Sequence, residues 1–576
     1  MNKPAARITA LSLSLLLLLA ACATTGPAPT TSPGQQAAIA LLEQGKPREA
    51  AQQLEAEAAL VRGAAKAQLL ADAAFAWHEA NDDARARMLL PQVQARQLSG
   101  ASRQRHALLG AELALADKQP AAALQALGTQ QPDLLPAAQQ ARWHLARGQA
   151  LEANGDAFAA AAARARAGVL LAGAARTDNQ RAITRLLAGL DDATLASRSA
   201  ALAAGDPLYN HAGRALIGRG LPLPRPFERD AAWQLDTSKR PPADADGYRP
   251  PLKMAVLLPL SGTLATAAAP VRDGLLAGYY GEYRRRPQVD FIDTRGTPAG
   301  AIAAYDKAVA GGADFVVGPL GRDEVDALFG REPLQVPLLA LNRGKDSPPA
   351  GSAGFSLAPE DDGIMAAEYL LARERGKVLV IGSNDDNGRR ATAAFGERFA
   401  ERGGKVVASL TVGDAPGDIG ARLRQAGVVD AVFLAVKGPQ ARALAPQLAL
   451  AGIGGATRVG TSQLVSGTGK AEEDMALDGI AFPSEAWTVR GAAGLPAASE
   501  LAATLPTARG AAARLFAFGF DAWKISAYLE KLANSTQGGL AGATGTLHLD
   551  GFGNVLRTPA WSTFSAGQPV PIGDGR

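Results

Sequence analysis

Polar residues and glycines directly follow a series of short apolar segments in the second half of this 576-residue chain. They are Ser261, Gly262, Gly318, Asn342, Ser383, Asn384, Asp385, Lys437 and Ser462. Open α/β sheets bind ligands beyond the carboxyl ends of their strands, so these positions predict a cleft for a polar ligand that the sequence does not identify. The competing interpretation is that the same residues cap helices and close turns, which Ser, Asp, Asn and Gly commonly do.

Motifs for catalysis or metal binding fail when their spacing is checked. No serine is followed three residues later by lysine, and the segment before Lys470 lacks the first glycine of a phosphate-binding loop. The five histidines are dispersed along the chain and none lies in a zinc-binding pattern. We therefore expect no catalytic residue, no metal and no cofactor.

The charge balance argues against a nucleic-acid partner. The chain has 59 basic and 55 acidic residues, a formal net charge of +4. Lys3 and Arg7 belong to the segment described next, so the remainder is closer to neutral. A nucleic-acid-binding protein usually carries a clear basic excess or a basic stripe.

Cys22 is the only cysteine, and it follows a basic start, the apolar run 11–19 and two alanines. This order is typical of an export signal over residues 1–21, and the run is too short to span a bilayer. Residues 19–22 (Leu-Ala-Ala-Cys) resemble the lipobox of bacterial lipoproteins. The resemblance implies a lipid anchor on Cys22. Ala23 follows, where an aspartate would favour the inner membrane, so we expect the anchor in the outer membrane, facing the periplasm. The alternative is a buried structural cysteine. Residues 22–34 read as a flexible tether.

Residues 35–220 are rich in strong helix formers and contain a repeat. Units that begin at residues 42, 78, 115 and 151 share a helix end, a polar turn, Pro or Asp at a helix start, and a small residue three positions later. A period of 36 to 37 residues with this layout predicts tetratricopeptide-like helix pairs. An irregular alanine-rich bundle is the alternative. Residues 221–251 carry seven prolines and are interpreted as a connector.

Short apolar runs alternate with amphipathic segments over residues 252–576. This alternation predicts parallel sheets with crossover helices, and the length predicts two lobes. Segment 545–555 reads as a hairpin. The expected fold class is therefore α plus α/β and multidomain, with an all-α repeat region followed by a two-lobed α/β domain.

The last region resembles the type I periplasmic binding-protein fold, and the whole chain resembles the LpoA family of penicillin-binding-protein activators. The strings that carry the resemblance are 257–262 (Leu-Leu-Pro-Leu-Ser-Gly), 271–277 (Val-Arg-Asp-Gly-Leu-Leu-Ala), 317–320 (Val-Gly-Pro-Leu), 337–342 (Pro-Leu-Leu-Ala-Leu-Asn) and 518–522 (Phe-Gly-Phe-Asp-Ala). The resemblance implies a non-catalytic lipoprotein that binds a class A penicillin-binding protein of the 1A type in the inner membrane and stimulates its transpeptidase. A periplasmic solute-binding receptor of a transport or sensing system is the alternative.

Overall fold

The computed structural model describes residues 33–229, 235, 237–331, 333–466, 469–534 and 539–573. The predicted export signal and Cys22, the expected anchor, lie outside the described residues. The chain divides into two compact units, Met1–Asn154 and Gly155–Arg576. In the described part of the chain, no helix combines the length and the apolar character needed to cross a membrane.

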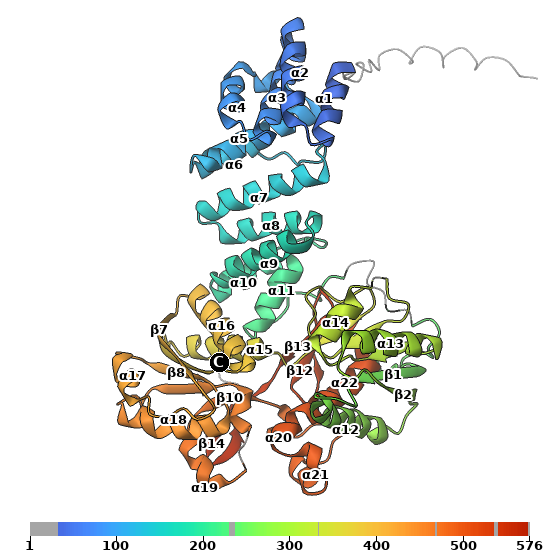
Figure 1. The fold of residues 1–576 in the computed structure, drawn as a ribbon, viewed down its shortest axis with the longest axis vertical. Helices are drawn as coiled ribbons and strands as arrows, with labels where there is room; N and C mark the ends of the chain where they lie inside the picture. Colours follow the sequence, from blue (N-terminus) through green and yellow to red (C-terminus); the bar gives the residue numbers. More distant parts are fainter. Residues whose placement is uncertain are drawn as a thin grey trace, which may run out of the picture. The chain divides into compact units, whose positions relative to one another are not determined.

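The first unit consists of helices that pack in antiparallel pairs (Figure 1). They are α1 (Pro33–Glu43), α2 (Pro47–Leu60), α3 (Gly63–Glu79), α4 (Asp83–Leu89), α5 (Gly100–Ala116), α6 (Pro120–Leu127) and α7 (Ala137–Ala153). The second unit begins with α8 (Ala157–Leu170), α9 (Gly173–Ala188), α10 (Asp192–Ala200) and α11 (Tyr209–Gly218). The all-helical region predicted from the sequence is therefore confirmed over residues 33–218.

Each predicted repeat turn contains one residue in the left-handed backbone conformation. The four are Gly45, Asn81, Lys118 and Gly155, with φ values of +73°, +58°, +57° and +84°. Glycine and asparagine tolerate this conformation, which reverses the chain between two helices, and a new helix starts two residues later. Lys118 has the same backbone conformation although it is neither glycine nor asparagine. The packing of the repeat, and not the type of this residue, therefore determines the turn.

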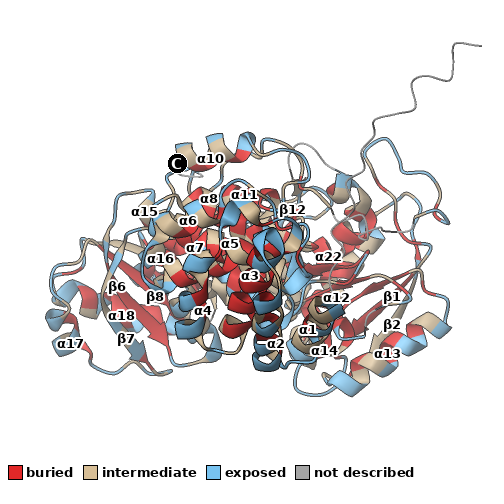
Figure 2. Ribbon diagram, turned by 90° about the horizontal axis from the view of Figure 1, so that it is seen from above, coloured by how far each residue is buried: buried red, intermediate tan, exposed pale blue. Residues whose placement is uncertain are grey.

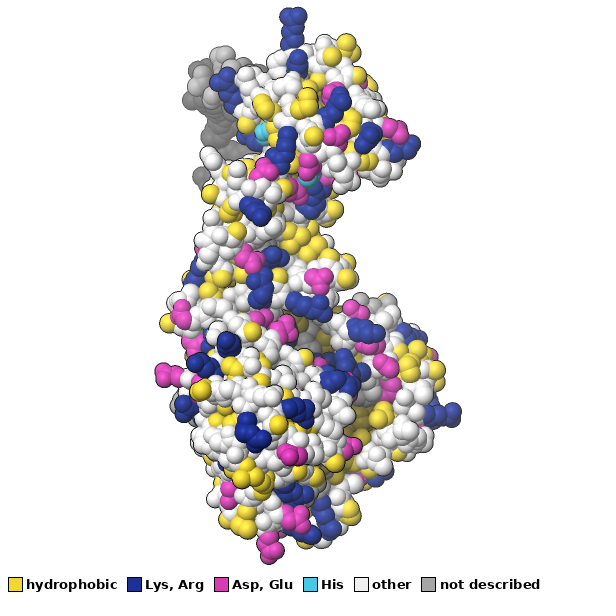
Figure 3. All heavy atoms as spheres, turned by 60° about the vertical axis from the view of Figure 1, so that its left-hand side comes forward, with side chains coloured by type: hydrophobic (Ala, Val, Ile, Leu, Met, Phe, Trp, Pro, Cys, Tyr) yellow, Lys and Arg dark blue, Asp and Glu magenta, His cyan; other side chains and the backbone are white. Residues whose placement is uncertain are grey.

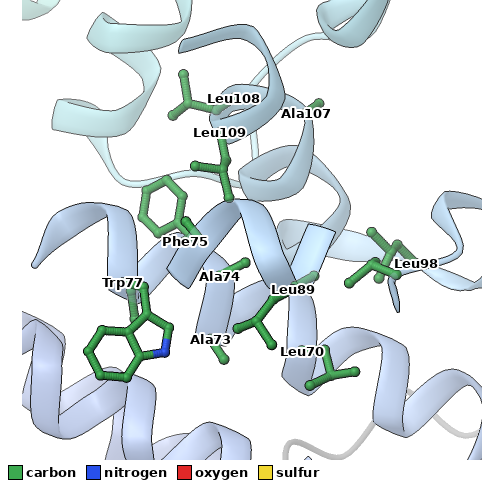
Figure 4. Close-up of a cluster of buried hydrophobic side chains, with 14 of the residues drawn as sticks. Leu70, Ala73, Ala74, Phe75, Trp77, Leu89, Leu98, Ala107, Leu108 and Leu109 are labelled. Atoms are coloured by element: carbon green, nitrogen blue, oxygen red, sulfur yellow. The ribbon is translucent and has the colours of Figure 1, made fainter. Parts of the chain in front are cut away.

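Small residues at the repeated position let the helices of the first unit pack closely. Ala50, Ala86 and Ala123 are completely buried at this position. Larger side chains fill the space between the pairs, and Figure 4 shows Phe75 and Trp77 of α3 among the surrounding leucines. Burying an aromatic or leucine side chain contributes about 1.5–3 kcal/mol, so these contacts hold successive repeats together.

The rest of the second unit contains two sheets, each at the centre of one lobe. The first lobe has β1 (Lys253–Leu258), β2 (Gln288–Asp293), β3 (Phe315–Val317), β4 (Leu338–Ala340), β5 (Ala353–Phe355), β11 (Leu540–Ala541), β12 (Thr546–Leu549) and β13 (Asn554–Thr558). Their order is β11-β12-β13-β5-β4-β3-β1-β2. The helices of this lobe are α12 (Ala265–Gly281), α13 (Pro298–Ala310), α14 (Arg322–Phe329) and α22 (Gly510–Asn534).

Strand β1 shows why helices cover both faces of the first sheet. Met254, Val256 and Leu258 belong to one core cluster with residues of α12 and α22, whereas Ala255 and Leu257 belong to another with residues of α13 and α14. Successive side chains of a strand point to opposite faces, so a strand that is apolar at every position must be covered twice. Figure 2 shows the central strands of both sheets as buried, whereas the edge strands β2 and β7 are mostly intermediate or exposed.

The second lobe repeats this layered arrangement. Its strands are β6 (Lys377–Ser383), β7 (Lys405–Val412), β8 (Ala431–Ala435), β9 (Thr457–Gly460), β10 (Ala481–Ser484), β14 (Ala560–Ser565) and β15 (Gln568–Pro571), in the order β15-β14-β10-β9-β8-β6-β7. Its main helices are α15 (Pro359–Leu371), α16 (Asp386–Glu401), α17 (Gly420–Gln425) and α18 (Gly438–Leu450). The short helices α19 (Ala471–Asp474), α20 (Ala486–Arg490) and α21 (Ala498–Thr504) follow in the chain.

The chain passes between the two sheets three times. It leaves the first lobe after β5, returns after β10 by way of α20 to α22, and crosses again between β13 and β14. The predicted two-lobed α/β domain and the hairpin of β12 and β13 are confirmed. Strands β5, β11, β14 and β15 were not predicted, because they are short or lack a continuous apolar run.

Helix α12 differs from its predicted position. The amphipathic pattern predicts a helix over residues 271–284, ended by the basic cluster 284–286, but α12 begins at Ala265 and ends at Gly281. The expectation that these cations complement the carboxyl end of the helix holds for Arg286, which donates to the carbonyl oxygen of Tyr279 in the last turn of α12 at 3.3 Å, but not for Arg284. Instead, Arg284 forms ion pairs with Glu282 and Asp246, at 2.8 and 3.0 Å.

Candidate functional site

Ser261 and Gly262 lie beyond the carboxyl end of β1, in the loop before α12, and Ser261 contacts the last residue of β2. The Ser261 hydroxyl donates a hydrogen bond to Asp293 Oδ2 at 2.6 Å, and the Leu260 amide donates to Asp293 Oδ1 at 2.9 Å. The bond from Ser261 is the main reason that the pKa of Asp293 lies below its ordinary value. Gly262 has φ of +83°, which forms the turn. The hydroxyl proton of Ser261 is thus used within the protein.

Gly318 and Asn342 close turns beyond β3 and β4. A Cβ atom on Gly318 would lie 2.0 Å from the carbonyl oxygen of Leu257, and its φ is +107°, so only glycine fits. The side-chain amide of Asn342 donates to the carbonyl oxygen of Leu320 at 2.8 Å. The Asn342 side-chain oxygen accepts from the next backbone amide at 3.0 Å. Both residues therefore perform a structural task.

Ser383, Asn384, Asp385 and Lys437 come together at the carboxyl ends of β6 and β8. Asp385 caps α16 by accepting from the amide of Gly388 at 2.8 Å, and Lys437 Nζ lies 3.1 Å from its Oδ2. Burial alone would raise the pKa of Asp385, but the Gly388 amide and Lys437 outweigh it and lower the pKa. Ser383 is buried and accepts from the Asp385 amide at 3.2 Å, whereas Asn384 is exposed.

Ser462 is buried and bound to a carboxylate that the sequence analysis missed. Its amide and its hydroxyl both donate to Asp362 Oδ2, at 3.0 and 2.5 Å. Asp362 lies in the first turn of α15, 100 residues earlier in the chain. Only 1% of Asp362 is exposed, so its charge must be balanced inside the protein.

Two arginines of the first lobe balance Asp362 and a second buried carboxylate, Glu485. Arg514 Nη2 and Arg557 Nη2 each lie 3.8 Å from an oxygen of Asp362. Arg514 Nε lies 3.1 Å from Glu485 Oε1, and Arg557 Nη1 lies 3.8 Å from the same atom. Asp362 and Glu485 belong to the second lobe, while Arg514 on α22 and Arg557 on β13 belong to the first.

A third pair of the same kind lies at the edge of these four residues. Arg343, in the loop after β4, donates from Nη2 to both carboxylate oxygens of Asp361, at 2.7 and 2.8 Å. Arg343 follows the predicted cleft residue Asn342, and Asp361 precedes Asp362 on α15. We call Arg343, Asp361, Asp362, Glu485, Arg514 and Arg557 the interlobe charge cluster.

The space beside Asp362 is too small for a solute. A cavity of about 10 Å³ lies there, lined by Pro359, Asp362, Asn387, Gly388, Ala391, Ala435, Thr461 and Gln463. This volume is about that of one water molecule. The cavity shares α15 and the ends of β8 and β9 with the part of the predicted site that contains Ser462.

The structure thus gathers the predicted residues into separate groups. One group contains Ser261 and Gly262, another contains Ser383 to Asp385 with Lys437, and Asn342 and Ser462 lie next to members of the interlobe charge cluster. Among the residues described, no hydrogen bond or ion pair joins these groups to one another. Over the same residues, no set of three or more His, Cys, Asp or Glu side chains is arranged to hold a metal ion.

The surface carries charges of both signs. On the face shown in Figure 3, lysine and arginine side chains are interspersed with aspartate and glutamate. This distribution agrees with the small net charge of the whole chain.

The helical repeats and the two-lobed α/β region together define the class of protein, because both are matched by one family. The model of the LppC putative lipoprotein family matches residues 44–204, 248–426 and 418–567. The chain belongs to that family.

Two curated proteins are similar to part of this chain. The chain is 28% identical over 354 residues to the penicillin-binding protein activator LpoA of Photobacterium profundum, covering 56% of this chain and 57% of that protein. It is 25% identical over 335 residues to the protein of the same name from Mannheimia succiniciproducens, covering 56% and 55%. The chain therefore spans about half the length of the curated relatives it matches.

A solved structure shares the fold over nearly the whole length. The crystal structure of full-length LpoA from Haemophilus influenzae superimposes with a TM-score of 0.50 at 18% identity, and the match covers 91% of this chain and 98% of that one. At this level of identity the likeness shows the fold alone.

Proposed function

We propose that this chain is a non-catalytic lipoprotein of the outer membrane that binds and activates a class A penicillin-binding protein of the 1A type. The observation that carries the proposal is the family match, which includes the repeats and both lobes, together with relatives that are named activators of penicillin-binding proteins. Stimulation of the partner's transpeptidase is the expected result of binding.

The use of the polar residues supports a docking protein. Several predicted cleft residues form side-chain hydrogen bonds within the protein; they are Ser261, Asn342, Asp385 and Ser462. An activator needs no reacting group, because a protein that binds an active conformation more tightly than an inactive one shifts the population toward activity. A tenfold shift needs a difference of about 1.4 kcal/mol in binding free energy.

The anchor supports the same proposal. A partner in the inner membrane and a lipid on Cys22 in the outer membrane would lie on opposite sides of the periplasm. A single acyl chain binds membranes only marginally, so a stable anchor requires further acylation of Cys22. In the sequence the repeats lie between the anchor and the two lobes, and the lobes would provide the docking surface.

The proposal is tested with the purified chain from residue 23 onward, which keeps every residue that the structure describes. It is mixed with a cognate class A synthase and lipid-linked substrate, and crosslinks in the glycan product are counted. We expect more crosslinking with the chain than without it, and a saturable complex in a binding assay. Unchanged crosslinking together with no complex would overturn the proposal.

The receptor alternative is separated by calorimetry on the same preparation. Amino acids and peptidoglycan fragments are titrated into the chain, with a large excess of each. An activator of the proposed kind gives no saturable heat, whereas tight binding of one of these solutes would support the receptor instead.

A further inference from the structure

We propose that the interlobe charge cluster is a lock that holds the two lobes in one relative orientation and that the lobes rotate only when it is released. The inference concerns the motion of the lobes and goes beyond the proposed docking function. It would remain whatever partner the protein binds.

The first observation is that the charges are sorted by lobe. The second lobe contributes only carboxylates, from Asp361, Asp362 and Glu485, and the first lobe contributes only guanidinium groups, from Arg343, Arg514 and Arg557. Each lobe alone would place like charges side by side. Burial and then the neighbouring charge of Arg514 lower the pKa of Arg557, which illustrates the repulsion that the opposite lobe relieves.

The second observation is the position of the cluster at the three crossovers. Asp362 follows the first crossover on α15, and Glu485 comes directly after β10 at the second. Arg557 lies near the end of strand β13, just before the third. These are the segments about which two lobes must rotate. Ion pairs that span them depend on the angle between the lobes, because a pair of charges needs close contact and good geometry to balance the cost of burial.

The third observation is that separation would leave buried charges unbalanced. Asp362 is 1% and Glu485 3% exposed, and the side chain of Arg557 is 4% exposed. Removing one partner of a buried ion pair is far more costly than replacing both, because the remaining charge has no counterion. The closed arrangement of the cluster is therefore strongly preferred over one in which the lobes have turned apart.

The hydrogen bonding of the cluster is incomplete, which lowers the cost of releasing the lock. Asp362 Oδ1, Glu485 Oε1, Arg514 Nη2 and Arg557 Nη2 are buried without a hydrogen-bond partner, and several of the contacts are 3.8 Å long. A buried network that is only partly satisfied is less stable than a complete one. The strongest contact between the lobes in this cluster is then the pair of hydrogen bonds from Arg343 to Asp361, at the edge of the cluster.

Helices of the repeat region contact both lobes and support the same orientation. Arg402 of α16 in the second lobe donates to the carbonyl oxygen of Leu190 at 3.0 Å. Arg214 of α11 lies 3.2 Å from Asp550 Oδ2, in the turn between β12 and β13 of the first lobe. A rotation of the lobes would have to break one of these contacts as well.

The test uses a pair of spin labels on helices of the two lobes. The chain from residue 23 onward has no cysteine, since Cys22 is the only one. Tyr280→Cys on α12 and Leu450→Cys on α18 then introduce unique sites, at residues that are 71% and 85% exposed. Pulsed electron paramagnetic resonance gives the distribution of distances between the labels. We expect one narrow maximum for the parent chain.

The test variant carries Asp361→Asn, Asp362→Asn and Glu485→Gln, and we expect a second maximum or a clear broadening. The matched control is Glu360→Gln, on the same helix, because Glu360 pairs with Arg390 inside the second lobe. The control should keep the narrow distribution. Circular dichroism checks that each variant is folded.

A second variant keeps the test decisive if the first does not fold. It replaces both sides of the whole cluster, with Asp361→Asn, Asp362→Asn, Glu485→Gln, Arg343→Gln, Arg514→Gln and Arg557→Gln, so that no charge is left unbalanced. We expect this variant also to show a second maximum or broadening. A distribution as narrow as that of the parent chain in the folded variants would overturn the proposal and would assign the cluster to stability alone.

Discussion

Helices α12 and α22 cross in the first lobe at two glycines, and filling either of them should destabilise the fold. A Cβ atom on Gly519 would lie 1.9 Å from the carbonyl oxygen of Val271. A Cβ atom on Gly274 would lie 1.9 Å from the carbonyl oxygen of Phe516. The two helices therefore touch backbone to backbone, in both directions, and this contact requires glycine on each side.

The magnitude for Gly519→Ala follows from two opposing effects. Alanine has a higher helix propensity than glycine, which alone would stabilise the variant by about 1 kcal/mol. The clash is with backbone atoms, which cannot move aside as a side chain can, and overpacking of this kind typically costs about 1–3 kcal/mol or more. The clash distance of 1.9 Å lies far inside van der Waals contact, so we expect a net loss of about 1–2 kcal/mol.

The assay is urea denaturation of the chain from residue 23 onward, with the free energy of unfolding extrapolated to water. Gly396→Ala is the matched control, because Gly396 lies within α16 and no atom lies within 4 Å of the Cβ position. The control should be slightly more stable than the parent chain. Gly274→Ala with Gly519→Ala should cost less than the sum of the two single changes, since the first change already separates the helices. A Gly519→Ala chain as stable as the control would refute the reasoning.

Three further predictions concern single side chains. His78 binds Glu112 and Asp83 at 3.1 and 2.6 Å, and the bond to Glu112 outweighs burial and raises its pKa above the ordinary 6.5. The resulting stability should be complete below pH 6.5 and should disappear as the pH rises through the raised pKa, and melting curves of the parent and His78→Gln should converge at high pH. Asp521→Asn should lower the free energy of unfolding by about 1–3 kcal/mol. The buried carboxylate accepts from the backbone amides of Ala543 and Thr544 at 2.6 and 2.7 Å, and an asparagine would turn a donor toward one of them. Equal urea midpoints for the variant and the parent chain would contradict this. Cys22→Ser should remove the activity in cells but leave the purified chain active, and a fully functional mutant in cells would show that the anchor is dispensable.

Local features of the sequence were sufficient to predict the helical repeats and the alternating strands and helices. The repeat turns contain Gly, Asn or Lys at one fixed position, and that position has the left-handed conformation in all four turns. The strand β1 is apolar at nearly every residue, which predicts burial on both faces. Short strands such as β5 and β15 have no such pattern. Pairing with neighbouring strands, and not their own sequence, makes these segments extended.

The sequence predicts which residues lie at the strand ends, but not which partners their side chains bind. Strand ends are recognisable along the chain, so the sequence predicts one cleft around all of these residues; the structure brings Asp385 and Lys437 into contact. Whether a hydroxyl or carboxylate is free depends on partners far away in the sequence. Ser462 is bound by Asp362, 100 residues earlier, and no local pattern indicates that pair.

By itself the sequence determined the order of the regions, the period of the repeats and the chemistry proposed for Cys22, because each of these depends on residues close together in the chain. The tertiary structure alone decided which charges meet. Arg343, Arg514 and Arg557 face Asp361, Asp362 and Glu485 only because the chain crosses three times between the lobes. Likewise, Gly274 and Gly519 belong to strings that carry the family resemblance, but only the structure places them at the close crossing of α12 and α22. Neighbouring residues in the sequence do not indicate contacts between distant segments, so these contacts and their roles are known only from the folded structure.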